Sequence, residues 1–266
     1  MKTNDETKIR YIMLTQMRGL GPVTHNALLD VCGGIEKCFE LDYDDLTDSE
    51  YAKRIGIKRI GSFMLQRNDE SIRHLAEEIV EKSDALGISI ITREDADFPD
   101  RFRNIDDMPV VLYVKGQLRV NEFERSIGVV GARRCTQEGK REAIDIATGA
   151  AYNGEAVISG MAKGIDSYAH TAALKSKGYT IAALGNGVDI CYPKEHDRLY
   201  EEIAEHGCIL SEYPPGTIPR EYNFPRRNRI IAALSDTLYV IDAGRNSGTQ
   251  STVESSRKFN REVITI

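Results

Sequence analysis

The stretch from Gly216 to Arg229 carries the side chains best suited to hold an anion. It contains four arginines and a single acid, Glu221, in a chain whose formal net charge is −6. Pro225 predicts the start of a helix, and three of the arginines would then lie in its first turn. Cations are unfavourable at the positive end of a helix dipole unless an anion compensates for them. With Phe224, whose ring offers a face for a base, these arginines indicate a groove for single-stranded nucleic acid.

The alternative interpretation of the same stretch is structural. In that case the arginines pair with nearby carboxylates such as Glu212, Glu221 or Asp242, and the net charge of the chain argues against a nucleic-acid partner. The sequence alone leaves both interpretations open.

Glycine, hydroxyl and basic residues also follow the other predicted strands. Gly131 would let an anion approach the backbone closely, and Thr136 is expected to cap the next helix beside Arg133. The backbone N–H groups of the loop 159–166 are likewise predicted to face an anion. The spacing matches neither a dinucleotide fingerprint nor a P-loop. The candidate DNA-binding residues are Gly131, Arg133, Ser159, Gly160, Lys194, Arg220, Phe224, Arg226, Arg227, Asn228, Arg229, Ser247, Gly248 and Thr249.

A hydrolytic site is not expected, although Ser159, Asp166 and His170 lie close in sequence. Asp166 and His170 are four residues apart on one predicted helix, and no nucleophile-elbow motif surrounds Ser159. Asp166 is expected to cap that helix, and His170 to form local packing or hydrogen bonds. We therefore predict no catalytic residue.

Composition bounds the class of protein. The chain has 266 residues, of which 41% are hydrophobic and 29% charged, values typical of a globular protein of about two domains. No apolar run approaches the ~20 residues that cross a bilayer, and the polar start shows no secretory signal, so a cytoplasmic location is expected. The five cysteines are scattered without metal-ligand spacing, which predicts reduced thiols and no metal site.

Strands and helices are predicted to alternate in most of the chain. This alternation predicts a mainly parallel, doubly wound sheet with helices on both faces, in which ligands bind at the carboxyl ends of the strands. Strands are predicted at 88–91, 110–114, 127–130, 156–158, 180–184, 208–210, 237–241 and 262–266. Helices are predicted at 71–86, 138–152, 166–177, 194–206, 226–234 and 251–259.

The first seventy residues have a different, purely helical pattern. Gly19-Leu20-Gly21-Pro22 separates two apolar periods, and Thr24 is a possible N-cap for the second helix. This is a helix-hairpin-helix pattern that can hold a backbone phosphate, with a plain interhelical turn as the alternative. We predict a helical domain over 1–70 and an α/β domain over 71–266.

Several runs resemble the DNA-processing protein A family, also called Smf. They are Gly131-Ala132-Arg133, the run from Ser159 to His170, Gly185-x-Gly187-Val188-Asp189-x-x-Tyr192-Pro193, the run from Ser211 to Gly216, Phe224-Pro225-x-Arg227-Asn228-Arg229-Ile230-Ile231, and Ser247-Gly248-Thr249.

The resemblance implies an extended Rossmann-like domain preceded by a small sterile-alpha-motif-like helical domain. It also implies a homodimer without a cofactor that binds single-stranded DNA and delivers it to the RecA recombinase in natural transformation. The family's DNA contacts map onto Arg133, Lys194 and the segment Arg220–Arg229.

Two departures and two alternatives remain. The family often has a further C-terminal winged-helix-like domain with no counterpart here, and the residues after Thr249 are more polar than usual. One alternative is an enzyme of the lysine-decarboxylase-like group of nucleotide phosphoribohydrolases, whose Pro-Gly-Gly-x-Gly-Thr-x-x-Glu run is absent. The other is a nucleotide sensor that uses the same pocket for a small ligand.

Overall fold

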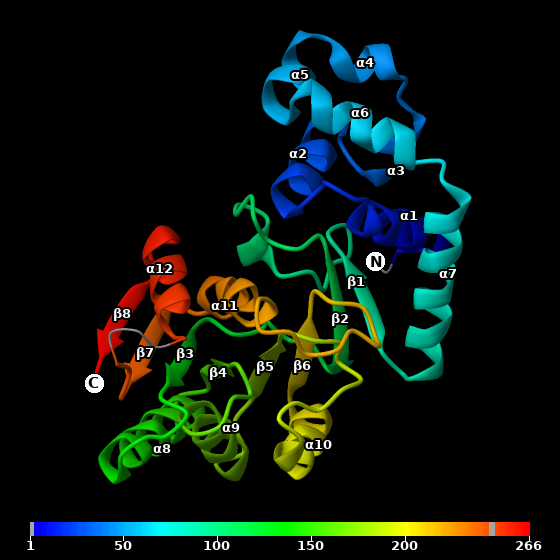
Figure 1. Ribbon diagram of the computed structural model, residues 1–266. Coiled ribbons are helices and arrows are strands. Elements are labelled where there is room, and N and C mark those ends of the chain that lie inside the picture. The colour runs from blue at the N-terminus through cyan, green and yellow to red at the C-terminus, as the bar shows by residue number, and fades with distance from the viewer. Residues whose placement is uncertain (1–2, 245–247) are drawn as a thin grey trace. The chain divides into compact units, whose positions relative to one another are not determined.

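The computed structural model describes residues 3–244 and 248–266 and contains two compact units, Met1–Leu112 and Tyr113–Ile266 (Figure 1). Because the division reflects where contacts are dense, it does not test the predicted domain boundary at residue 70, which stays a prediction.

The first unit is mainly helical. Pro22 stands at the first position of α2, where its ring presets the helical φ and its missing N–H is not needed. The helix therefore begins two residues before Thr24, and the expected cap at Thr24 is wrong. The elements of this unit are α1 (Asp5–Gln16), α2 (Pro22–Cys32), α3 (Ile35–Glu40), α4 (Tyr43–Thr47), α5 (Ser49–Ile55), α6 (Ile57–Gln66), α7 (Glu70–Ala85), β1 (Ser89–Thr92) and the 3-10 turn Asp100–Phe102.

The second unit alternates strands and helices, as predicted. Strand β2 begins at the end of the first unit and continues into the second. The elements are β2 (Val111–Gly116), β3 (Ser126–Gly131), α8 (Gln137–Tyr152), β4 (Ala156–Ser159), α9 (Ile165–Lys175), β5 (Thr180–Leu184), the 3-10 turn Lys194–His196, α10 (Asp197–His206), β6 (Cys208–Ser211), α11 (Asn223–Leu234), β7 (Thr237–Ile241), α12 (Gln250–Lys258) and β8 (Glu262–Thr265).

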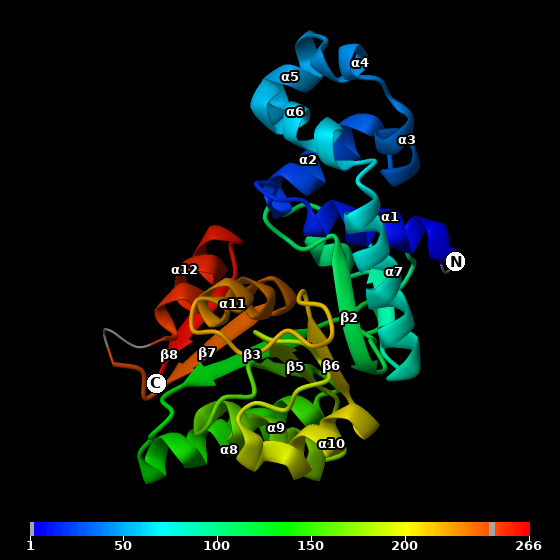
Figure 2. The same ribbon diagram turned by 45° about the vertical axis from the view of Figure 1, so that its right-hand side comes forward.

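The strands form one sheet in the order β1-β2-β6-β5-β4-β3-β7-β8. From β6 to β8 every neighbouring pair is parallel, whereas β2 runs antiparallel to β6. In the second unit, α8, α9 and α10 cover one face and α11 and α12 the other (Figures 1 and 2). The predicted α/β class with a mainly parallel, doubly wound sheet is confirmed.

Small residues bring α8 and α9 close to the sheet and to each other. Ala143 and Ala147 of α8 and Ala169 and Ala173 of α9 are buried in the same cluster as the strand residue Val157. Alanine has no side chain beyond Cβ, so the two helices can approach closely while the strands supply the larger apolar groups. This packing holds the loops at the carboxyl ends of β3 and β4 on a rigid base.

Candidate nucleic-acid interface

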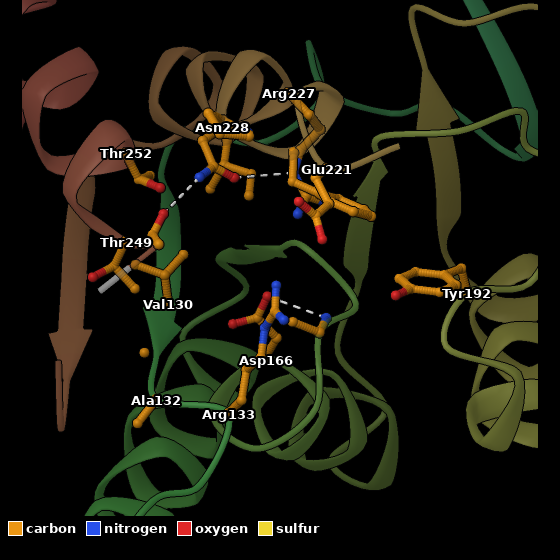
Figure 3. A pocket seen from close by; sticks show the side chains of 16 residues that line it. Val130, Ala132, Arg133, Asp166, Tyr192, Glu221, Arg227, Asn228, Thr249 and Thr252 are labelled. Carbon is orange, nitrogen blue, oxygen red and sulfur yellow. Dashed lines mark hydrogen bonds between the residues drawn. The ribbon is translucent and has the colours of Figure 1, made fainter. Parts of the chain in front are cut away.

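A cavity of about 620 Å³ lies at the carboxyl ends of the central strands in the second unit. Figure 3 shows two walls facing it: Glu221, Arg227 and Asn228 on the α11 side, and Arg133 and Asp166 on the opposite side. We call this cavity and its rim the strand-end site. Its lining residues are Val130, Gly131, Ala132, Arg133, Ala162, Asp166, Tyr192, Glu221, Phe224, Pro225, Arg227, Asn228, Ile231, Gly248, Thr249 and Thr252.

Arg133 provides the exposed cation of the site. Strand β3 ends at Gly131, where a Cβ would collide with the carbonyl oxygen of Ile241 and lie 2.6 Å from Ile165 Cγ1. Only a glycine therefore fits between these neighbours, and the chain can turn sharply towards Arg133. Among the ion pairs of the described residues none involves Arg133, which is exposed and lines the cavity. Its guanidinium is thus available to a ligand.

Two aromatic rings flank the cavity. Tyr192, in the loop after β5, and Phe224, in the first turn of α11, are stacked with their centroids 5.6 Å apart and their planes at 21°. Tyr192 is 44% exposed, whereas Phe224 is half-buried. Both rings line the cavity that Arg133 also lines, so the site combines a cation with an aromatic surface.

Arg227 is buried rather than exposed to solvent. It is 5% exposed, and its Nη1 donates to the carbonyl oxygens of Gly160, at 2.8 Å, and Ala183. Its Nε donates to Asn228 Oδ1 at 3.1 Å. Burial lowers the pKa of Arg227 to about 10, while Asp166 opposes that shift. Arg227 therefore ties α11 to the ends of β4 and β5, and most of its hydrogen-bonding capacity is used within the protein.

The remaining arginines differ in their environments. Helix α11 begins at Asn223, two residues before the expected start, so Arg227 and Arg229 lie in the second turn and not the first. Arg229 forms a two-pronged ion pair with Glu212, with N–O distances of 2.6 and 2.7 Å. The structural alternative therefore holds for Arg229, while Arg220 and Arg226 are exposed with their guanidinium groups over the Tyr222 ring.

Two groups of backbone amides that were candidates for binding an anion, in the loop 159–166 and at the N-terminus of α8, are occupied by carboxylates of the chain itself. Asp166 Oδ2 accepts from the backbone N–H groups of Gly160 (3.1 Å) and Ala162 (3.3 Å). Asp242 Oδ2 accepts from the N–H and hydroxyl of Thr136, the N-cap of α8, at 2.6 and 2.8 Å. The expectation that the 159–166 amides face an external anion is wrong for these two groups, because Asp166 already holds them.

Asp166 thus has a different place from the expected one. The N-cap of α9 is Gly164, so Asp166 lies inside the helix and binds the preceding loop. Burial raises the pKa of its carboxyl group, opposed by Arg227 and the two amide hydrogen bonds. A Cβ on Gly160 would lie 2.6 Å from Arg227 Nη2 and 2.8 Å from Asp166 Oδ2. Gly160 is therefore required where these two side chains close around the backbone.

His170 makes a local hydrogen bond, as predicted. Its Nδ1 lies 2.7 Å from Thr180 Oγ1, whose own hydrogen goes to the carbonyl oxygen of Val157. Nδ1 must then carry the hydrogen, and the buried Nε2 has no hydrogen-bond partner. Burial lowers the pKa of His170 to about 3, with smaller contributions from His196 and Arg227.

The other predicted residues differ in whether they line the cavity. Gly248, Thr249 and Asn228 line the cavity, and Asn228 Nδ2 donates to the Gly248 carbonyl at 3.1 Å. Ser159 is fully buried and donates to the carbonyl of Val129, so its hydroxyl does not reach the cavity. Lys194 is exposed but is not part of the cavity wall. Ser247 lies outside the described residues.

Two residues that matter for the site were absent from the predicted set. Tyr192 belongs to the Gly185–Pro193 motif, and an aromatic residue in a strand-end loop is itself a signal for stacking. The sequence offers Asp242 as a partner for arginines, and nothing local in it indicates that Asp242 binds Thr136 at the N-terminus of α8. Within residues 3–244 and 248–266, no group of three or more histidine, cysteine or acidic side chains could hold a metal ion, and no helix is long and apolar enough to cross a membrane.

The fold and the site together define a Rossmann-like α/β protein with a cavity at the carboxyl ends of its strands. Residues 89–266 match the family model described as DNA recombination-mediator protein A, and the chain belongs to this family.

Relatives and solved structures agree with this assignment. Protein Smf of Synechocystis is 36% identical over 259 residues, which are 96% of this chain and 63% of that protein. DNA processing protein DprA of Streptococcus pneumoniae is 40% identical over 169 residues, 64% of this chain and 59% of that one. The chain thus spans about three fifths of these two curated relatives.

The X-ray structure of DNA processing protein A from S. pneumoniae matches with a TM-score of 0.79 at 32% identity, covering 100% of this chain and 87% of the other. A structure of the Helicobacter pylori protein, described for its single-stranded DNA binding mode, matches with a TM-score of 0.62 at 31% identity, covering 67% and 80%.

Proposed function

We propose that this chain binds single-stranded DNA at the strand-end site and acts as a recombination mediator that loads RecA recombinase on incoming DNA in natural transformation. Membership of the DNA recombination-mediator protein A family supports the proposal. The H. pylori relative described for its single-stranded DNA binding mode supports the choice of ligand.

The observation that carries the proposal is the combination of Arg133 with the Tyr192–Phe224 stack around one cavity. An arginine neutralises a phosphate, and aromatic rings stack on bases of any sequence. Unpaired bases can reach such rings, whereas the bases of a duplex are stacked on one another. The site therefore favours a single strand over a duplex.

Carboxylates determine where the phosphates lie. Asp166 and Glu221 line the cavity, and Asp242 occupies the N-terminus of α8. A phosphate deep in the cavity would be repelled by the carboxylates that line it, so we expect the DNA backbone to run past Arg133 and past the exposed Arg220 and Arg226, which are sequence neighbours of the lining residues Glu221 and Pro225. The cavity itself is left to the uncharged bases.

The first prediction tests this arrangement by replacing Arg133 with alanine. Loss of one phosphate contact is expected to lower the affinity for single-stranded DNA by about 5- to 10-fold. It is also expected to reduce the steepness of log K plotted against log salt concentration by about 0.7. Arg134→Ala is the matched control, because Arg134 is also exposed but does not line the cavity.

The measurement is a titration of single-stranded DNA, duplex DNA and a mononucleotide at two salt concentrations. The proposal expects binding in that order of strength. Equal affinity of Arg133→Ala and the unchanged protein would contradict the assigned site, and preference for the mononucleotide would favour a nucleotide sensor. Release of free base from a nucleoside monophosphate would contradict the proposed non-enzymatic role.

The proposed partners are RecA and a second copy of the chain, in the cytoplasm. Sedimentation equilibrium checks the homodimer. The RecA step is checked by the ATPase rate of RecA on DNA coated with a single-strand-binding protein, which the chain is expected to raise. A rate unchanged by the chain would remove the loading role while leaving DNA binding in place.

A further inference from the structure

A second hollow, of about 710 Å³, lies on the helical face formed by α8, α9 and α10. Helix α9 lies between the other two helices (Figures 1 and 2). We call this hollow the helix groove. It is lined by Lys140 and Ile144 of α8, by Ser167, Tyr168, Thr171, Ala172 and Lys175 of α9, and by Glu195, His196, Arg198, Leu199 and Glu202 from the 3-10 turn and α10.

The floor of the groove is one face of α9. Ser167, Thr171 and Lys175 are spaced four residues apart, and the span from 167 to 175 is about 12 Å long. The hydroxyls of Ser167 and Thr171 donate to the carbonyl oxygens of Gly164 (2.8 Å) and Ser167 (2.7 Å). These short side chains are turned back onto their own helix, and lining residues of α8 and α10 flank them.

The groove carries an excess of positive charge. Its two glutamates are both in ion pairs: Glu202 with Arg198 at 2.9 Å, and Glu195 with Lys163. Among the ion pairs of the described residues none involves Lys140 or Lys175. Lys140 Nζ lies 4.7 Å from the centre of the Tyr168 ring, and Lys175 is exposed. Two lysines and an aromatic ring thus face the groove without an anionic partner.

The groove borders the strand-end site through the loop that connects β4 to α9. Lys163 lines a small hollow next to Arg133 and Phe224, and the same side chain pairs with Glu195 of the groove. His196 of the groove donates from Nδ1 to the carbonyl oxygen of Met161 in that loop, at 3.1 Å. A strand leaving the strand-end site over Lys163 would enter the groove directly.

We propose that the helix groove is a second track for the same DNA strand, one that binds about three further phosphates beyond the strand-end site. The length of the floor, about 12 Å, fits this number at about 3.4 Å per nucleotide of a helical strand. The two unpaired lysines supply the charge. This inference rests on the proposed function, because the strand reaches the groove from the strand-end site.

The test compares two oligothymidines, of about 6 and about 16 nucleotides, within the range of site sizes for single-strand binders. The unchanged protein is expected to bind the longer one more tightly. The double variant Lys140→Ala/Lys175→Ala is expected to lose about 3- to 10-fold in affinity for the longer oligonucleotide, with a salt dependence lower by about 1.4. Its affinity for the shorter oligonucleotide is expected to stay the same, which also reports that the variant is folded.

The matched control is Arg125→Ala/Arg141→Ala. It removes the same charge from the second unit, and Arg141 is adjacent to Lys140 on α8, but neither arginine lines the groove. The control is expected to behave like the unchanged protein. A second variant, Thr171→Glu, puts a negative charge on the floor and is expected to weaken only the longer oligonucleotide.

Several outcomes would overturn the track. The lysine variant and the control could lose the same affinity for the longer oligonucleotide, or the lysine variant could lose none. The lysine variant could also lose affinity for the shorter oligonucleotide. An unchanged protein that binds both lengths equally also overturns the track but leaves the strand-end site standing. Failure of the unchanged protein to bind either length overturns the proposed function as well.

Discussion

At the scale of single residues, similar side chains in one short segment have different roles. Arg226 is exposed, Arg227 is buried in a hydrogen-bonded cluster, and Arg229 is paired with Glu212. A count of charges in the sequence treats these three residues alike. Their environments show that Arg226 is available to a ligand, while Arg227 holds the walls of the cavity together.

Replacing Arg227 with alanine is therefore expected to lower the free energy of unfolding. The carbonyl oxygens of Gly160 and Ala183 would lose a donor and Asp166 would lose the nearby cation, a change that typically costs about 3–5 kcal/mol. Urea unfolding followed by circular dichroism measures it, because the chain has no tryptophan.

Arg226→Ala serves as the control for Arg227→Ala and is expected to change the free energy of unfolding by less than about 0.5 kcal/mol. Similar unfolding curves for the two variants would show that the buried hydrogen bonds of Arg227 do not stabilise the fold. In that case a direct contact of Arg227 with a DNA phosphate would explain its role better. Such a contact predicts that Arg227→Ala lowers the affinity for DNA.

At the scale of elements, α8 shows how a helix N-terminus can be closed to a ligand. Thr136 caps the helix through Gly139, and Asp242 from the end of β7 binds Thr136 in turn. The carboxylate neutralises the positive end of the helix dipole. The proposed phosphate contact at this strand end then depends on the Arg133 side chain.

Asp242→Asn tests that account. Asparagine accepts the left-handed conformation of this residue, φ 53°, so the backbone should persist. Loss of the charge is expected to lower the free energy of unfolding by about 1 kcal/mol and to raise the affinity for single-stranded DNA by about 2- to 5-fold, because a negative charge near Arg133 is removed. Thermal unfolding and the DNA titration measure the two effects.

Asp145→Asn is the control, since it removes the same charge from an exposed position on α8. It is expected to leave both stability and DNA affinity nearly unchanged. If Asp242→Asn bound DNA no better than this control, repulsion by Asp242 would not limit binding at the strand-end site.

At the scale of the whole molecule, each compact unit contains a buried neutral histidine. Burial lowers the pKa of His25, in the first unit, to about 4 and that of His170, in the second, to about 3. Both values lie below the 6.5 of an exposed histidine, so the unfolded chain binds protons that the folded chain does not. Each histidine therefore contributes full stability above pH 6.5 and loses it as the pH falls towards the folded value.

For His170 the loss between pH 7 and pH 5 is expected to be about 2 kcal/mol in the free energy of unfolding. Asp166, whose pKa is raised by burial, acts in the opposite direction. The His170→Asn variant keeps a donor towards Thr180 but does not titrate, so its unfolding should depend less on pH than that of the unchanged protein. Parallel pH profiles for the two proteins, measured by urea unfolding at pH 7 and pH 5, would contradict this prediction.

Much of the fold follows from local properties of the chain. The strands at 180–184 and 237–241 occur where the apolar runs predict them, and the other strand predictions agree to within two residues. Apolar periodicity and glycine placement act over a few residues, so they can be recognised in the sequence. The same holds for the positions of Arg133 and Phe224 in strand-end loops, which the cavity brings together.

The sequence by itself determined the order of the elements, the doubly wound class and the edge of the sheet at which polar loops collect. Only the tertiary structure decided which charges remain available there. Asp166 and Asp242 bind amide groups that an external anion would otherwise use, Glu212 pairs with Arg229, and Arg227 is buried. These pairings join segments up to 106 residues apart. They depend on distances in the folded protein, which local patterns do not encode.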